Sequence, residues 1–212
     1  MRHNPPWSER PWVLTEAGRR DRIGTAVDCG LCEAAAEQAR AEDLSLNGAP
    51  RDRWPRGVWL QPSIVAWSQL LLDSLDRWTG HELISRQGTA EEQSGTLFFA
   101  PLVVVSHGTE PDPLFNYGNQ TALELWETDW SRLIGMPSRL TAETEDQAER
   151  QRMLDRVAKD GYVRDYRGVR RSVTGRRFSV EDALVWTVLR LDGTRKGEAA
   201  AFSRWSHLPE RD

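Results

Sequence analysis

The sequence predicts an α+β fold in which helices cover one face of a five-stranded antiparallel sheet, preceded by an amphipathic helix and an irregular N-terminal extension. Three observations support this prediction. Residues 101–119 hold two short stretches with the apolar or alternating pattern of strands. Residues 120–157 then follow a helical period. After Gly161 the pattern returns to a period of two, interrupted by turn sequences.

Composition limits the classes of function. The chain has 212 residues, which is room for one domain and an extension. Its formal net charge of −4 provides no general attraction to nucleic acid or to an anionic membrane. No apolar run approaches the roughly 20 residues of a membrane span, and the N-terminus lacks the apolar stretch of a signal peptide. With two cysteines and no secretory signal, we expect a cytoplasmic protein.

Residues 1–57 are predicted to form an extension that is partly disordered. They are rich in Pro, Arg and Trp, and one thin Ala-rich helix over 31–43 cannot support a core. Cys29 and Cys32 lie near the start of that helix. They are compatible with a redox pair, with half of a zinc site and with two ordinary thiols. The lack of a βαβ pattern and of further ligands favours ordinary thiols.

Residues 58–212 form the predicted domain, which begins with an amphipathic helix over 62–78. Pro62 suits a first helical turn. Apolar side chains recur every three or four residues along the helix and mark one face. Two interpretations stay open. The helix covers the sheet, or Leu70 and Leu72 widen its apolar surface into a homodimer interface.

After a predicted loop over 79–96, two strands are expected over 101–107 and 114–119. Asn119 directly precedes a helical pattern, so it is expected to be an N-cap. The helices that follow are predicted over 121–127, 130–134 and 141–157.

Two hairpins complete the predicted sheet. Gly161 is the expected C-cap of the charged helix over 141–157, because glycine readily adopts the left-handed conformation. The turn sequences are Thr174-Gly175 and Asp192-Gly193. The predicted strand segments are 162–173, 176–180, 183–191 and 197–205.

His107 and Glu198 are the candidate acid and base. His107 alternates with two valines, on the face that is buried if those valines are buried. Glu198 shares the side of Phe202 and is expected to meet His107 or Arg170. Such a pair can transfer protons. It can equally have a purely structural role, in which the buried histidine is hydrogen-bonded and the carboxylate forms an ion pair. Both interpretations stay open.

The candidate ligand-binding residues are aromatic or basic. An aromatic ring stacks on a flat ligand or simply fills the core, and an arginine near an apolar layer needs an anion from the protein or from a ligand. These candidates are Tyr117, Trp126, Trp130, Arg139, Arg170 and Trp186. No metal site is predicted.

The arginines of the first hairpin, between 164 and 177, are the one feature that suggests nucleic acid. Exposed charge also protects an edge strand from aggregation. We therefore do not expect nucleic-acid binding.

Between Pro62 and Trp205 the chain carries a dense set of short motifs: Ser106-His107, Asp112-Pro113-x-Phe115-Asn-Tyr117-x-Asn119, Pro137-Ser-Arg139, Gly168-x-Arg170, Gly175-Arg-Arg-Phe178, Val185-Trp186 and Gly197-x-Ala-Ala. This set resembles the MEKHLA domain, a PAS-related module found alone in bacteria and at the C-terminus of plant class III homeodomain-leucine-zipper proteins. The resemblance implies a PAS-like fold and a sensory or regulatory role, and supplies no catalytic residues. The family usually has Gln where this chain has Glu198. Residues 97–205 contain no cysteine, which argues against a light sensor that forms a flavin adduct.

These observations predict a stand-alone module that binds a small molecule and acts through dimer or partner contacts. An alternative is a small enzyme that uses the PAS-like cavity on an anionic or aromatic molecule, with His107 and Glu198 as acid and base. A third interpretation is an interaction protein with a filled core. The identity of the ligand and of any cofactor is not predicted.

Overall fold

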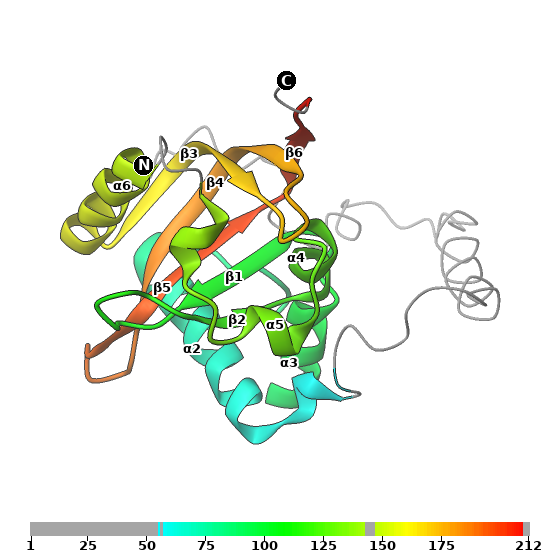
Figure 1. The fold of residues 1–212 in the computed structure, drawn as a ribbon. Helices are drawn as coiled ribbons and strands as arrows, with labels where there is room; N and C mark the ends of the chain where they lie inside the picture. Colours follow the sequence, from blue (N-terminus) through cyan, green and yellow to red (C-terminus); the bar gives the residue numbers. More distant parts are fainter. Residues whose placement is uncertain (1–54, 56, 143–146, 210–212) are drawn as a thin grey trace, which may run out of the picture. The chain divides into compact units, whose positions relative to one another are not determined.

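A computed structural model describes residues 55, 57–142 and 147–209. Almost all of the predicted extension, including Cys29 and Cys32, lies outside these residues. Within them the predicted α+β class is confirmed, because an antiparallel sheet carries helices on its faces (Figure 1). No helix in the described part of the chain is long and apolar enough to cross a membrane.

The sheet has the strand order β2-β1-β5-β4-β3, which is the PAS order. The strands are β1 (Val103–His107), β2 (Phe115–Gly118), β3 (Tyr162–Arg171), β4 (Arg177–Leu189), β5 (Arg195–Phe202) and β6 (Arg204–His207). Each neighbouring pair is antiparallel.

Strand β4 differs from the prediction, which divided it into two segments. It runs without a break because it pairs with β5 over residues 184–189 and with β6 over residues 178–181. Asp182, which lies between the two predicted segments, adopts a φ of +52° inside the strand. The short β6 is therefore a sixth strand beyond the predicted five.

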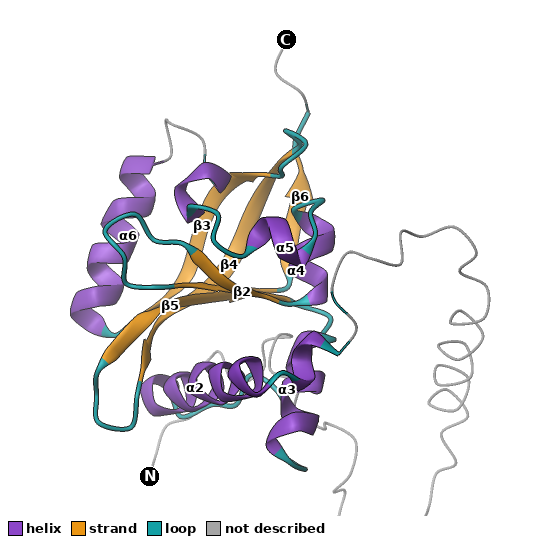
Figure 2. Ribbon diagram, turned by 60° about the horizontal axis from the view of Figure 1, so that its bottom comes forward, coloured by secondary structure: helices purple, strands orange, loops and turns teal. Residues whose placement is uncertain are grey.

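Helices α2 (Pro62–Thr79) and α3 (Ala90–Phe98) cover one face of the sheet, here called the outer face (Figure 2). Leu71 and Leu75 of α2 pack with Leu184 and Trp186 of β4 in one buried cluster. The indole Nε1 of Trp186 donates to the Leu71 carbonyl at 3.2 Å. The apolar side of the predicted helix 62–78 is thus buried within the protomer, as the sheet-covering interpretation expected.

Helix α3 corrects the prediction of a continuous loop over 79–96. Thr89 accepts from the backbone N–H of Glu92, and the Glu92 carboxylate accepts from the backbone N–H of Thr89. This reciprocal capping box satisfies two backbone donors at the start of the helix. The sequence pattern Thr-x-x-Glu at Thr89 and Glu92 is the signature of such a box.

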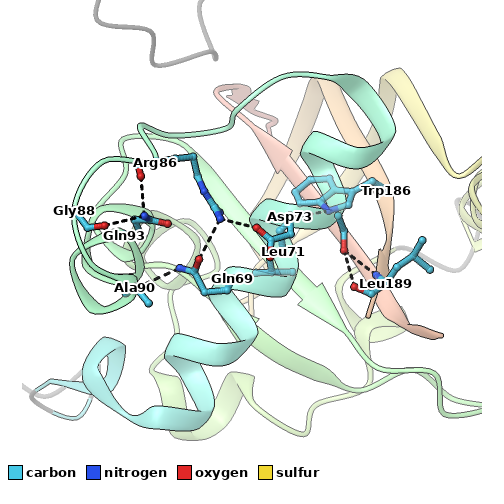
Figure 3. Close-up of polar contacts among 10 residues, drawn as sticks. Gln69, Leu71, Asp73, Arg86, Gly88, Ala90, Gln93, Trp186 and Leu189 are labelled. Carbon is cyan, nitrogen blue, oxygen red and sulfur yellow. Dashed lines mark hydrogen bonds and ion pairs between the residues drawn. The ribbon is translucent and has the colours of Figure 1, made fainter. Parts of the chain in front are cut away.

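The loop that remains, between α2 and α3, is fixed by polar contacts to both helices (Figure 3). The guanidinium of Arg86 donates to Asp73 at 2.5 Å and to Gln69 at 3.1 Å, both on α2. From α3, the amide of Gln93 donates to the carbonyl of Arg86 at 2.8 Å and to that of Gly88 at 3.2 Å.

The other face of the sheet, here called the inner face, carries α4 (Gln120–Leu125), α5 (Trp130–Leu133), η2 (Ser138–Thr141) and α6 (Gln147–Asp160) (Figure 2). Asn119 caps α4 by accepting from Ala122 N at 3.1 Å, as predicted. Gly161 follows α6 at a φ of +86°, and its N–H donates to the Val157 carbonyl. This face holds the candidate site.

Candidate functional site

A cavity of about 70 Å³ lies on the inner face, between the sheet and the segments η2 and α6. A buried water needs about 10–15 Å³ of such space, so the cavity has room for a few waters or one small molecule. Ala200 marks its floor, because it is partly exposed although it lies in the central strand β5. Most of the wall is apolar, and the polar lining residues are Ser106, His107, Ser138, Thr141, Arg150, Tyr166, Arg170 and Glu198.

His107 and Glu198 come together in the cavity wall. The antiparallel register of β1 and β5 places them directly opposite each other. Nδ1 of His107 lies 3.5 Å from Oε2 of Glu198 and 3.0 Å from the carbonyl oxygen of Gly108. Since a carbonyl only accepts, Nδ1 carries the proton, and Nε2 of the neutral ring is an acceptor. The guanidinium of Arg195 binds the other oxygen, Oε1, of Glu198.

Burial lowers the pKa of His107 from its usual value of 6.5. The carboxylate of Glu198 opposes this by favouring the charged ring, and the nearby Arg150 adds to the lowering. A neutral imidazole forms no ion pair with the carboxylate of Glu198, which already binds Arg195. The ring is better suited to accept a hydrogen bond or a proton at Nε2.

Arg170 and Arg150 supply the positive charge of the cavity. Both side chains are buried, at 9% relative exposure. Arg170, on β3, donates to the Tyr166 hydroxyl and to the Val169 carbonyl, each at 2.8 Å. Arg150, on α6, donates to the Ser138 hydroxyl at 2.6 Å. Two guanidinium groups in one apolar-walled cavity can bind an anion.

Arg150 was not a predicted site residue, because the charged helix over 141–157 was expected only to expose one side to solvent. A signal was present in the sequence. Arg150, Met153 and Val157 follow the i, i+3, i+7 period of one helical face, and all three are buried. An arginine at a position of the apolar helical face indicates a charge that faces the protein interior.

The predicted aromatic residues do not converge on one place. Trp126 lines the cavity. Tyr117 and Trp186 are fully buried in the outer-face cluster, beneath α2, and burial raises the pKa of Tyr117. Trp130 packs against both clusters and meets the Tyr117 ring edge-on. The structure therefore separates Tyr117, Trp130 and Trp186 from the cavity.

Arg139 also lies away from the cavity. Its side chain is half exposed and forms an ion pair with Asp112 at 3.1 Å. This is the internal partner that an arginine near an apolar layer requires.

No group of three or more His, Cys, Asp or Glu side chains that could hold a metal ion occurs in residues 55, 57–142 and 147–209. The cavity supplies one imidazole and one carboxylate, and the carboxylate is engaged by Arg195.

Comparison with known proteins identifies two family models along the chain. Residues 65–207 match the MEKHLA domain. Residues 1–36 match a protein of unknown function, DUF3565. A curated relative, the homeobox-leucine zipper protein ATHB-14 of Arabidopsis thaliana, is 32% identical over 103 residues. The match spans 47% of this chain and 12% of that protein.

Solved structures similar to this chain are PAS and light-oxygen-voltage domains. The PAS domain of a protein from Colwellia psychrerythraea is 11% identical, with a TM-score of 0.48 over 57% of this chain and 98% of that one. A light-oxygen-voltage domain studied with a flavin analogue is 14% identical, with a TM-score of 0.44 over 56% of this chain and 85% of that one. Because both scores are under 0.5, the PAS-like description rests on the strand order. The MEKHLA model matches more than half of the chain, and the protein belongs to the MEKHLA domain family.

Proposed function

We propose that this MEKHLA domain is a sensory or regulatory module that binds a small molecule in the inner-face cavity. The observation that carries the proposal is the cavity itself, with an apolar wall and a few converging charged groups. Ligand sites in proteins have this character, since apolar walls supply affinity and a few polar groups fix orientation. A filled core, the third interpretation, would not leave Ala200 partly exposed in a central strand.

Output through a partner or a homodimer is part of the proposal. A dimer through residues 62–78 would have to use the outward side of α2, because its apolar side is buried against the sheet. That outward side is small and polar, with Ser63, Ala66, Asp73 and Asp76 exposed. Ligand-dependent changes are expected first at α6 and η2, which close the cavity.

Native mass spectrometry of the freshly purified full chain tests the proposal. We expect a small molecule bound at one per protomer, and the same spectrum gives the monomer or dimer mass. The variant Ala200→Leu fills the cavity and should remove the bound mass. The matched control Ala66→Leu adds the same side chain on the exposed side of α2 and should keep it. A bound mass that survives Ala200→Leu in a folded protein would place the ligand elsewhere.

An enzyme is the second candidate, favoured by the His107–Glu198 pair in the cavity wall. Nε2 of neutral His107 would be the base, and Glu198 would orient the ring. Incubating the purified chain with the molecule identified above, followed by mass analysis, separates the two functions. Turnover that is lost in His107→Gln with ligand binding intact supports the enzyme. An unchanged molecule supports the sensor.

A further inference from the structure

Two arginines, Arg150 from α6 and Arg170 from β3, line the cavity without a carboxylate partner among the described residues. Every hydrogen bond of either guanidinium goes to a neutral group: Ser138, Tyr166 or the Val169 carbonyl. The Arg170 guanidinium also stacks on the Tyr166 ring, 5.4 Å from its centroid. Buried charges in proteins are normally paired, because an unpaired charge loses its hydration without compensation.

The charges around the cavity do not balance within it. Glu198 is the only carboxylate among the lining residues, and Arg195 occupies its Oε1 while His107 lies at its Oε2. Arg150 therefore has no ion pair among the described residues, and it shares the cavity wall with Arg170. Burial lowers the pKa of Arg150, and the neighbouring charge of Arg170 is the next cause of that lowering. Two like charges in the wall of one apolar cavity create a site for a negative charge.

Resting on the proposed function, we infer that the ligand is a small organic carboxylate with a short apolar body. Its carboxylate is bound by Arg150 and Arg170, and its body lies against the apolar wall that includes Trp126 and Phe202. The planar guanidinium fork matches the two oxygens of a carboxylate. The volume of about 70 Å³ restricts the body to a few carbon atoms.

Such a ligand would bridge a strand of the sheet and a helix that packs on it. Arg150 belongs to α6, and its Ser138 partner belongs to η2, whereas Arg170 belongs to the edge strand β3. A carboxylate held by both arginines would join α6 to β3. The bound anion would therefore stabilise the packing of α6 over the cavity.

Isothermal titration calorimetry on the full chain, after extensive dialysis, tests the inference. The probes are propionate and butyrate, their neutral amides, and inorganic phosphate. We expect saturable binding of a carboxylate, and at least a tenfold loss of affinity in Arg150→Gln and in Arg170→Gln. Arg150→Lys keeps the charge but lacks the fork and should also weaken binding. The control Arg171→Gln, an exposed arginine next to Arg170, should bind as the wild type does.

Three results would overturn the inference. They are equal binding of carboxylate and amide, binding of phosphate as tight as that of the carboxylates, and no binding of any carboxylate. Circular dichroism of each variant separates lost binding from lost folding. If a neutral molecule binds and Ala200→Leu removes it, the proposed sensor function stands and only the ligand class is wrong. If native mass spectrometry also finds nothing bound in the cavity, both proposals fail.

Discussion

Replacing Asn119 with alanine should destabilise the domain far more than the loss of an ordinary helix cap. Its side chain is fully buried, and its Oδ1 accepts from Ala122 N at 3.1 Å and from Val104 N at 2.9 Å. Its Nδ2 donates to the carbonyl of Leu102 at 2.7 Å and, at longer range, to that of Ala100. The residue therefore joins the start of α4 to the strand β1.

The magnitude follows from the groups that lose a partner. Loss of an N-cap costs about 1 kcal/mol. Each buried backbone group left without a partner costs about 1–3 kcal/mol. With the N–H of Val104 and the carbonyl of Leu102 both affected, Asn119→Ala should lower the free energy of unfolding by about 3–7 kcal/mol. That is a large part of the stability of a typical domain.

Urea unfolding followed by circular dichroism measures this loss. Asp129→Ala is the matched control, because Asp129 caps α5 through Arg132 N at 2.9 Å on an exposed side and should cost only about 1 kcal/mol. Asn119→Ser keeps a capping oxygen and should recover about 1 kcal/mol relative to alanine. The reasoning is refuted if Asn119→Ala costs no more than Asp129→Ala, since the buried bonds would then contribute nothing.

Three further predictions follow from the cavity wall. Gly197→Ala should destabilise the fold by about 1–3 kcal/mol, because the added Cβ would collide with the His107 carbonyl. The control is Gly193→Ala, at a turn where the added Cβ meets open space. If both variants lose the same stability, the strain of a positive φ and not the collision is the cause. The pKa of His107 is lowered in the folded protein, so the unfolded chain binds more protons and the free energy of unfolding should fall as the pH drops below about 6.5. The variant His107→Gln should make the free energy of unfolding depend less on pH in this range. An unchanged pH dependence would contradict a buried neutral ring. Trp126 lines the cavity, so Trp126→Phe should remove most of the fluorescence change on ligand binding, whereas Trp205→Phe should not.

Helix α6 carries one of the two arginines that line the cavity. Helix α6 packs on the inner face through Met153 and Val157, next to Val163 and Val185. Arg150 lies one turn before this apolar contact and so reaches the cavity. A ligand in the cavity would contact the helix and the strands at once, which is the arrangement that the proposed sensor needs to pass a binding event to its surface.

Several features were predictable because they depend on local chemistry. The cap at Asn119, the left-handed Gly161 and the burial of His107 each follow from a residue type and its immediate neighbours. The alternation that placed Glu198 on the side of Phe202 also held, since a strand has a period of two. The cytoplasmic location and the homodimer stay predictions.

The chain by itself determined the fold class, the order of elements and the family, because periodicity, turn residues and motifs are written in consecutive positions. Only the tertiary structure decided which helices cover each face of the sheet, and so which side chains reach the cavity. It placed Tyr117 and Trp186 beneath α2, paired Arg139 with Asp112 at the surface, and brought Arg150 and Arg170 into the wall of one cavity. These outcomes depend on which elements pack on each face of the sheet. The spacing of residues within α6 or within β3 cannot predict that the two elements contact each other, because each spacing describes only its own segment.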